Sequence, residues 1–97
     1  MKTYIALCRF TDQGIRSVKD TTKRADAVKE LAKKFGASMR QIYWTSGHYD
    51  LVAVIEANDD ESVNAFGLSI AAAGNIRTEM LRAFSKDEMN AILAKMV

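Results

Sequence analysis

Five residues near the middle of the chain have side chains that can bind a ligand or take part in a reaction: Tyr43, Trp44, His48, Tyr49 and Asp50. His48 is the only histidine, and its imidazole titrates near neutral pH, as a general acid or base must. No nucleophile or metal partner is evident beside it, so an exposed turn residue is the alternative. Tyr49 can bind a ligand through its hydroxyl, or it can be a core aromatic beside Trp44. We therefore predict a ligand site formed by these five residues, with no assigned catalytic group.

Asp50 and Cys8 each allow a structural interpretation beside a functional one. A buried Asp50 needs a cation or an amide, so it forms either a ligand contact or an ion pair with Arg9, Arg77 or Arg82. Cys8 is the only cysteine, and nothing nearby in the sequence would activate its thiol, which favours a small core residue. No P-loop, dinucleotide fingerprint, metal-ligand spacing or nucleophile elbow occurs. We therefore expect no cofactor and no metal.

The composition is typical of one soluble globular domain covering residues 1–97. Of the 97 residues, 48% are hydrophobic and 27% are charged. The 14 basic and 12 acidic residues give a net charge of +2, which is too balanced for a surface built to bind nucleic acid. No apolar run resembles a signal peptide or a membrane span, and a single cysteine cannot form an internal disulfide. We expect a cytoplasmic protein that binds neither nucleic acid nor membrane.

The five candidate residues lie at the tip of a predicted β-hairpin. Its strands are Met39–Ser46 and Asp50–Ala57, and Gly47 and His48 form a two-residue type II′ turn, because Gly47 can take positive φ. The predicted register pairs Thr45 with Asp50, Trp44 with Leu51, Tyr43 with Val52 and Ile42 with Ala53.

The register also divides the hairpin into two faces. Trp44 and Tyr49 fall on the face with Leu51, which is apolar enough to receive helices. Tyr43 and Asp50 fall on the other face, together with Val52 and Val54 among others. That second face is too apolar for open water and too polar for a plain core, so we expect it to have a partner.

The remaining elements follow from hydrophobic spacing and capping residues. Residues 11–19 are predicted to be a connector with a turn at Asp12-Gln13-Gly14, and a capping box, Ser85 with Glu88, starts the last helix. The other predicted elements are a central strand Thr3–Phe10, a helix from about Thr21 to Phe35, a helix from the Asn58 or Asp59 cap to Gly74, and a strand Asn75–Phe84. Each of these two helices has an apolar stripe at helical spacing, formed by Ala25, Val28, Leu31, Ala32 and Phe35 in the first and by Val63, Phe66, Ile70 and Ala73 in the second.

This order of elements defines a fold class. A strand, helix, strand, strand, helix, strand order is the ferredoxin-like α+β arrangement βαββαβ, here with an extra C-terminal helix and a four-stranded antiparallel sheet. Both crossover helices then cover one face and leave the face with Tyr43, Val52 and Val54 bare. We predict a homodimer, or a higher homo-oligomer, in which two such sheets stack. The last helix, with Met89 and Ile92, packs either on its own sheet edge or on a neighbouring chain.

Several short segments resemble those of the GYD domain family, named for its glycine, tyrosine and aspartate. They are Thr11–Ile15, Gly47-His48-Tyr49-Asp50, Gly74–Thr78, Glu56–Asp60 and Arg82–Phe84. The resemblance implies a ferredoxin-like domain that pairs into a dimeric α+β barrel with no established activity. His48 occupies a variable position of the family motif, which argues against a shared catalytic role. Thr21-Thr22 departs from a serine-proline pair that is common in the family.

Three functions are compatible with these observations. The first is a dimer that binds or senses a small molecule, in a pocket between sheet and helices or at the dimer seam. The second is a cofactor-free small-barrel enzyme of the oxygenase or isomerase type, which rests on analogy of fold. The third is a purely structural oligomerisation module. Whether the protein is an enzyme is left open by the sequence.

Overall fold

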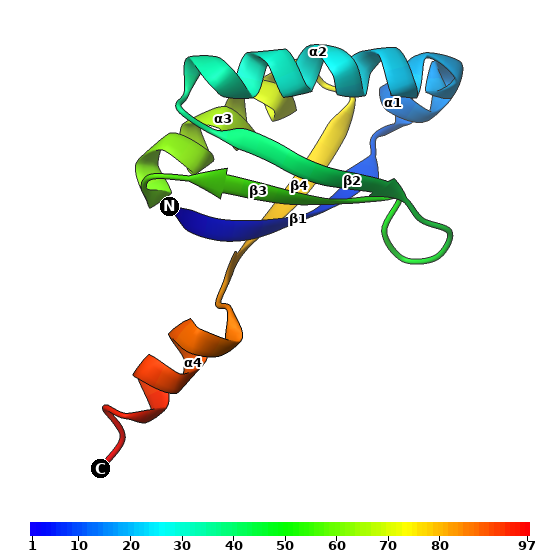
Figure 1. Cartoon of the computed structure of the whole chain (residues 1–97). Helices are drawn as coiled ribbons and strands as arrows, with labels where there is room; N and C mark the ends of the chain where they lie inside the picture. The colour runs from blue at the N-terminus through cyan, green and yellow to red at the C-terminus, as the bar shows by residue number, and fades with distance from the viewer.

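Four antiparallel strands form one sheet in the order β2-β3-β1-β4. The computed structural model describes residues 1–97, and Figure 1 shows α1, α2 and α3 on one side of the sheet. The predicted ferredoxin-like α+β fold is confirmed. The strands are β1 (Lys2–Phe10), β2 (Ser38–Trp44), β3 (Leu51–Ala57) and β4 (Ile76–Ala83), and the helices are α1 (Asp12–Arg16), the 3₁₀ turn η1 (Val18–Asp20), α2 (Thr21–Lys34), α3 (Asp60–Ala72) and α4 (Lys86–Leu93).

β1 is the central strand, as its two apolar faces predict. It pairs with β3 on one side and with β4 on the other. Tyr4, Ala6 and Cys8 point toward the helices and are buried. On the same side, α2 and α3 pack through the predicted stripes, and the rings of Phe35 and Phe66 lie 5.9 Å apart between centroids. The core is therefore a single layer between the sheet and these two helices.

The hairpin has the predicted register but a different turn. The pairs from Ile42–Ala53 to Trp44–Leu51 occur as expected, and the amide of Thr45 donates to the carbonyl of Asp50 at 2.9 Å. The ladder ends there, and residues 46–49 form a four-residue loop, so the two-residue type II′ turn is wrong. Gly47 does take positive φ, at 135°. Because residues 46–49 lie outside the ladder, their side chains do not alternate between the two faces of the sheet.

The connector after β1 also differs from the prediction. Residues 12–16 form the single-turn helix α1, whose N-cap Thr11 accepts a hydrogen bond from the amide of Gly14 through its side chain. One turn is too short to produce a hydrophobic period, so the sequence indicated only a turn there. α1 docks on the segment between α3 and β4, because the amide of Thr11 donates to the carbonyl of Asn75 at 3.0 Å.

The sheet face opposite the helices, called the bare face below, has no covering element (Figure 1). Tyr43 there is 58% exposed and Leu81 is 41% exposed. The bare face carries Gln41 and Tyr43 of β2, Val52, Val54 and Glu56 of β3, Thr3, Ile5, Leu7 and Arg9 of β1, and Arg77, Glu79, Leu81 and Ala83 of β4.

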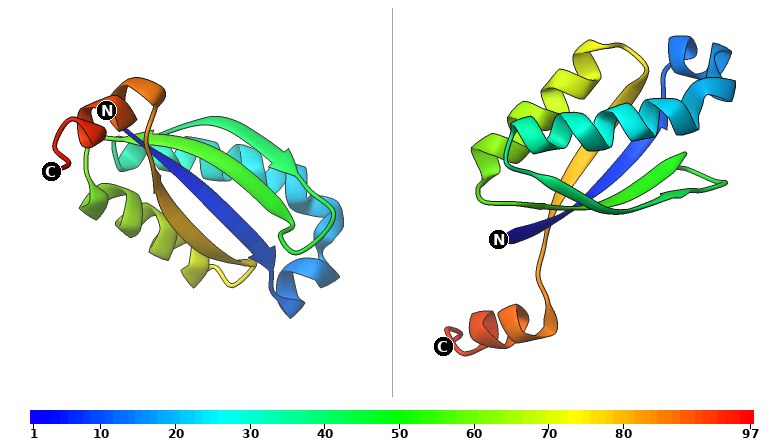
Figure 2. Two further views of the ribbon diagram at one scale, coloured as in Figure 1. Left: turned by 90° about the horizontal axis from the view of Figure 1, so that it is seen from below. Right: turned by 45° about the horizontal axis from the view of Figure 1, so that its top comes forward.

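α4 stands apart from the rest of the chain, on the side of the bare face (Figures 1 and 2). The molecule measures 51 Å along its longest axis and 18 Å along its shortest. None of its helices has the length and apolar character needed to cross a lipid bilayer.

Gly14→Ala tests how closely α1 packs on the α3–β4 segment. A β-carbon on Gly14 would lie 2.0 Å from the carbonyl oxygen of Asn75, so α1 must shift. We expect a loss of roughly 1–3 kcal/mol in the free energy of unfolding, measured by urea denaturation. Gly67→Ala is the matched control: its β-carbon meets only Met80 Cε at 3.4 Å, and alanine favours the helix, so stability is expected to hold or rise. Equal stability of the two variants would contradict the packing argument.

Candidate functional site

An apolar cavity of about 270 Å³ lies between the sheet and helices α2 and α3. It has 23 lining residues, of which 17 are hydrophobic. Small side chains on facing elements leave the space: Ala6 and Ala53 on the sheet, Ala25 on α2 and Gly67 on α3. Apolar concave sites of this kind are where proteins hold small ligands. A pocket between sheet and helices was one of the two places considered from the sequence, and hydrophobic spacing predicted which faces meet, but it did not show which residues would line the cavity.

The polar side chains that line the cavity are engaged within the protein. Arg24 donates to the carbonyls of Ser17, at 2.8 Å, and of Gly14, at 3.3 Å. Asn75 Oδ1 accepts from the side-chain amide of Gln13 at 3.0 Å. These bonds fasten α1 and the turn after it to the end of the cavity, and they commit the guanidinium of Arg24, the one charged group in the lining, to main-chain acceptors.

Cys8 brings the only thiol of the chain to the cavity lining. Its Sγ lies 3.5 Å from Thr78 Oγ1. Burial raises the pKa of the Cys8 thiol, and the hydrogen bond with Thr78 opposes this only in part. The thiol is therefore neutral, as expected for a core cysteine. No three His, Cys, Asp or Glu side chains lie close enough together to hold a metal ion.

None of the five predicted site residues lines the cavity. Trp44 lies on the helix side as predicted, where its Nε1 donates to Thr21 Oγ1 at 3.0 Å, and it remains 41% exposed. Tyr43 is on the bare face, also as predicted, beside Val52. Ligand binding by these residues stays a prediction, and it would take place outside the cavity.

Tyr49 lies on the bare face, and its predicted place on the helix side with Trp44 is wrong. Its hydroxyl donates to Glu79 Oε2 at 3.2 Å, and the guanidinium of Arg9 lies 5.0 Å from its ring centroid. His48 is exposed, with its ring 5.0 Å from that of Tyr49, and its Nε2 accepts from the Arg9 guanidinium. The loop after Thr45 thus turns Tyr49 and His48 toward the end of β1 and β4.

Asp50 binds the main chain of β1. Its Oδ2 accepts from the amide of Phe10 at 2.9 Å, and its own amide donates to the carbonyl of Cys8 at 2.8 Å. The arginine ion pair considered from the sequence is not formed. The carboxylate instead supplies the acceptor that a further residue of the β3 ladder would have supplied, and so it completes the pairing of β1.

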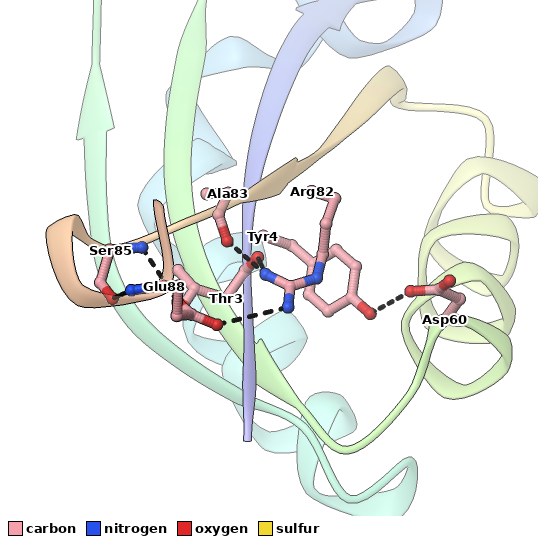
Figure 3. A network of polar contacts seen from close by, with 7 residues as sticks. All are labelled: Thr3, Tyr4, Asp60, Arg82, Ala83, Ser85 and Glu88. Atoms are coloured by element: carbon pink, nitrogen blue, oxygen red, sulfur yellow. Dashed lines mark hydrogen bonds and ion pairs between the residues drawn. The ribbon is translucent and has the colours of Figure 1, made fainter. Parts of the chain in front are cut away.

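A second polar network lies at the opposite end of the sheet (Figure 3). The hydroxyl of buried Tyr4 donates to Asp60. Burial, together with this carboxylate, raises the pKa of Tyr4 to about 12. Arg82 donates to the carbonyl of Thr3 at 3.3 Å and pairs with Glu88 of α4 at 3.5 Å. The network joins β1, β4 and α4 and is remote from the hairpin tip.

These features define a class: a ferredoxin-like α+β domain with helices on one sheet face and an apolar cavity beneath them. Three segments meet at one end of the sheet, namely Thr11–Ile15, Gly47–Asp50 and Gly74–Thr78. The profile of the family described as GYD domain matches residues 4–93. The chain belongs to the GYD domain family.

Relatives of known sequence or structure agree with this assignment. One is the "Glutamine synthetase and cystathionine beta-lyase binding protein" of Thermus thermophilus, 34% identical over 84 residues, which cover 86% of this chain and 88% of the relative. Another is the protein of the crystal structure of TTHA0845, also from Thermus thermophilus. It superposes with a TM-score of 0.57 at 26% identity, over 88% of this chain and 95% of that one.

Asp50→Ala and Asp50→Asn test whether the Asp50 carboxylate holds the end of β1. Alanine leaves the amide of Phe10 without an acceptor, so we expect a loss of roughly 1–3 kcal/mol in unfolding free energy and faster hydrogen exchange at Phe10. Asparagine keeps an oxygen at that position and should lose clearly less. If both variants exchange the Phe10 amide at the wild-type rate, the bond does not hold β1.

Proposed function

We propose that this protein is a homodimer that binds a small, uncharged, apolar molecule in the cavity between the sheet and helices α2 and α3. The observation that carries the proposal is the cavity itself, about 270 Å³ in volume with 17 hydrophobic residues among the 23 that line it. A cavity of roughly 150 Å³ holds a benzene molecule, so this one suits a molecule of about two aromatic rings. The bound molecule gains by removing apolar walls from water.

The chemistry of the lining supports an uncharged ligand. Arg24 and Asn75 are already hydrogen-bonded to α1 and its following turn, and the Cys8 thiol is neutral. A charged ligand would lose its hydration, which is costly in an apolar site, and the one charged group in the lining, Arg24, already donates to main-chain carbonyls. Selection against charge therefore follows from the same residues that form the cavity.

The bare face supports the dimeric half of the proposal. Ile5, Leu7, Val52 and Val54 lie next to one another across β1 and β3, and all four are only half-buried in the single chain. Stacking two such faces removes this apolar surface from water. Tyr43, His48 and Tyr49 would then lie at or near the seam, where a ligand contact by these residues is still a prediction. A free thiol at Cys8 suits a reducing, cytoplasmic compartment.

Binding of other proteins is a second candidate function. The observation that favours it is the name of the 34% identical relative, a binding protein for glutamine synthetase and cystathionine beta-lyase. Leu68, 72% exposed on α3, adds an apolar contact point on the side away from the bare face. Direct binding of this chain to the two purified enzymes, measured by calorimetry, tests this candidate without involving the cavity.

Two dyes with one framework test the ligand class. N,N-dimethyl-1-naphthylamine is neutral and has two rings, and 5-dimethylamino-1-naphthalenesulfonate adds a sulfonate. We expect the neutral dye to bind one site per chain, and the sulfonate to bind at least about tenfold more weakly, because a sulfonate loses its hydration in the cavity and the one cation of the lining, Arg24, already donates to the carbonyls of Ser17 and Gly14. Fluorescence titration measures both affinities.

Ala25→Phe places a ring in the cavity from α2 and should weaken the neutral dye at least about tenfold. The matched control is Ala65→Phe, because Ala65 is exposed on α3 and does not line the cavity. The proposal fails if the two phenylalanine variants bind the dye equally, or if the sulfonate binds as well as the neutral dye.

Val54→Lys tests the dimer. Val54 lies in the middle of the bare face, between Ile5 and Gln41. A lysine there would bury an unpaired charge, so we expect a monomer at micromolar concentration by sedimentation velocity. Ala72→Lys, on the exposed side of α3, should stay dimeric. A stable wild-type monomer at that concentration rules out the dimer.

A further inference from the structure

α4 has an apolar face that stays exposed in the single chain. Met89 is 44% exposed, Ile92 is 38% exposed and Leu93 is 48% exposed. Phe84, just before the helix, is 51% exposed, and no residue of α4 is buried. In the right-hand view of Figure 2 the helix stands clear of α2 and α3. The stripe predicted to pack somewhere is thus left without a partner inside the chain.

The start of α4 is nevertheless held firmly. Ser85 and Glu88 form the predicted capping box, with the amide of Ser85 donating to Glu88 Oε1 at 2.9 Å. Arg82 pairs with Glu88 and lies over the ring of Phe84, 4.5 Å from its centroid. The same guanidinium donates to the carbonyls of Thr3 and Ala83 (Figure 3). These contacts tie the first turn of α4 to β1 and β4 and set the direction in which the helix leaves the sheet.

A helix of this length needs a packing partner. α4 has eight residues, and isolated helices shorter than about 12–15 residues are marginal in water. The capping box and the ion pair with Arg82 stabilise only its first turn. Packing of the stripe formed by Met89, Ile92 and Leu93 must supply the rest, because tertiary contacts provide most of the stability of helices in proteins.

We propose that α4 is an arm that packs on the second copy of the dimer, so that each chain holds its partner with its own C-terminal helix. This inference rests on the dimer proposed above. The arm leaves the sheet on the side of the bare face, as Figure 1 shows, so a second copy stacked on that face lies within its reach. Phe84 lies between Ala83, the last residue of the bare face on β4, and the start of α4, and a second copy presents the same bare face and the same arm in return.

The area of the bare face supports the same partner. Four strands of seven to nine residues, about 4.8 Å apart and rising about 3.3 Å per residue, cover roughly 500 Å². Two stacked faces therefore bury about 1,000 Å², whereas stable interfaces typically bury about 1,600 Å². Phe84 and the stripe of α4, from both chains, supply apolar area of the size that is missing. The arm thus brings a small sheet-to-sheet contact into the range of a stable dimer.

A pair of double variants tests the arm. Ile92→Gln with Leu93→Gln removes its apolar contacts, and glutamine keeps the helix propensity. We expect the dissociation constant of the dimer, from sedimentation equilibrium, to rise roughly 100-fold or more. The matched control is Ala91→Gln with Ala94→Gln, on the opposite face of the same helix, and its dissociation constant should stay within about twofold of wild type.

A photoreactive residue identifies what the arm touches. With p-benzoylphenylalanine at position 93, irradiation of the purified protein should link two copies, and at position 91 it should not. Mixing isotopically light and heavy chains distinguishes a link between copies from one within a chain. A link within the chain overturns the proposal.

The arm and the dimer can fail separately. If Val54→Lys dissociates the dimer while the glutamine pair at positions 92 and 93 leaves its dissociation constant unchanged, the arm is excluded and the dimer stands. If the wild-type protein is a monomer, both fail.

Discussion

The bond between the carboxylate of Asp50 and the amide of Phe10 is the contact on which this end of the fold depends. β1 is central, so its last amides are sheltered from water and each needs an acceptor. Asp50 serves Phe10, and the carbonyl of Asn75 serves the next amide, that of Thr11. The chain can then leave the sheet into α1 without an unpaired donor. Asp50, just before β3, and Asn75, just before β4, thereby hold the end of a strand distant from both in sequence.

The cavity follows from this arrangement. α1 lies against the segment before β4 because Gly14 has no β-carbon to meet Asn75, and Arg24 of α2 binds the carbonyls of Gly14 and Ser17. The N-terminal end of α2 is therefore bonded to α1 and does not pack closer to the sheet. With Ala6 and Ala53 beneath it, the space between helix and sheet stays open. The Gly-His-Tyr-Asp motif has a structural role here. Gly47 permits the loop, Tyr49 covers the end of the bare face, and Asp50 completes the hydrogen bonding of β1.

Local signals in the sequence were sufficient for the fold but not for the site. The register up to Thr45 and Asp50, the two helix stripes and the Ser85–Glu88 capping box each depend on neighbours in sequence or on a fixed period, and all were predicted. The sheet face on which Tyr49 lies was not predicted, because side chains alternate only as far as the ladder extends. Beyond the ladder, the loop sets the direction of the Tyr49 side chain. Asp50 accepts a hydrogen bond from a main-chain amide instead of pairing with an arginine, and this outcome depends on where β1 ends. The cavity depends on the volumes of side chains from four elements at once, which no period along one element reports.

The cavity and the exposed apolar stripe of α4 have the same physical origin, namely the small size of the core. Only twelve buried hydrophobic residues form it, and five of them are alanines. Alanine on facing elements brings little volume to the core, so the layer between sheet and helices remains unfilled. Closed cavities cost about 24 cal/mol per Å³ in proteins, and even a part of that cost is recovered when a ligand fills the space. The bare face and the stripe of α4 are apolar area that the core has no room to bury. Ligand and second copy thus supply, from outside, the packing that a 97-residue chain with an alanine-rich core cannot supply by itself.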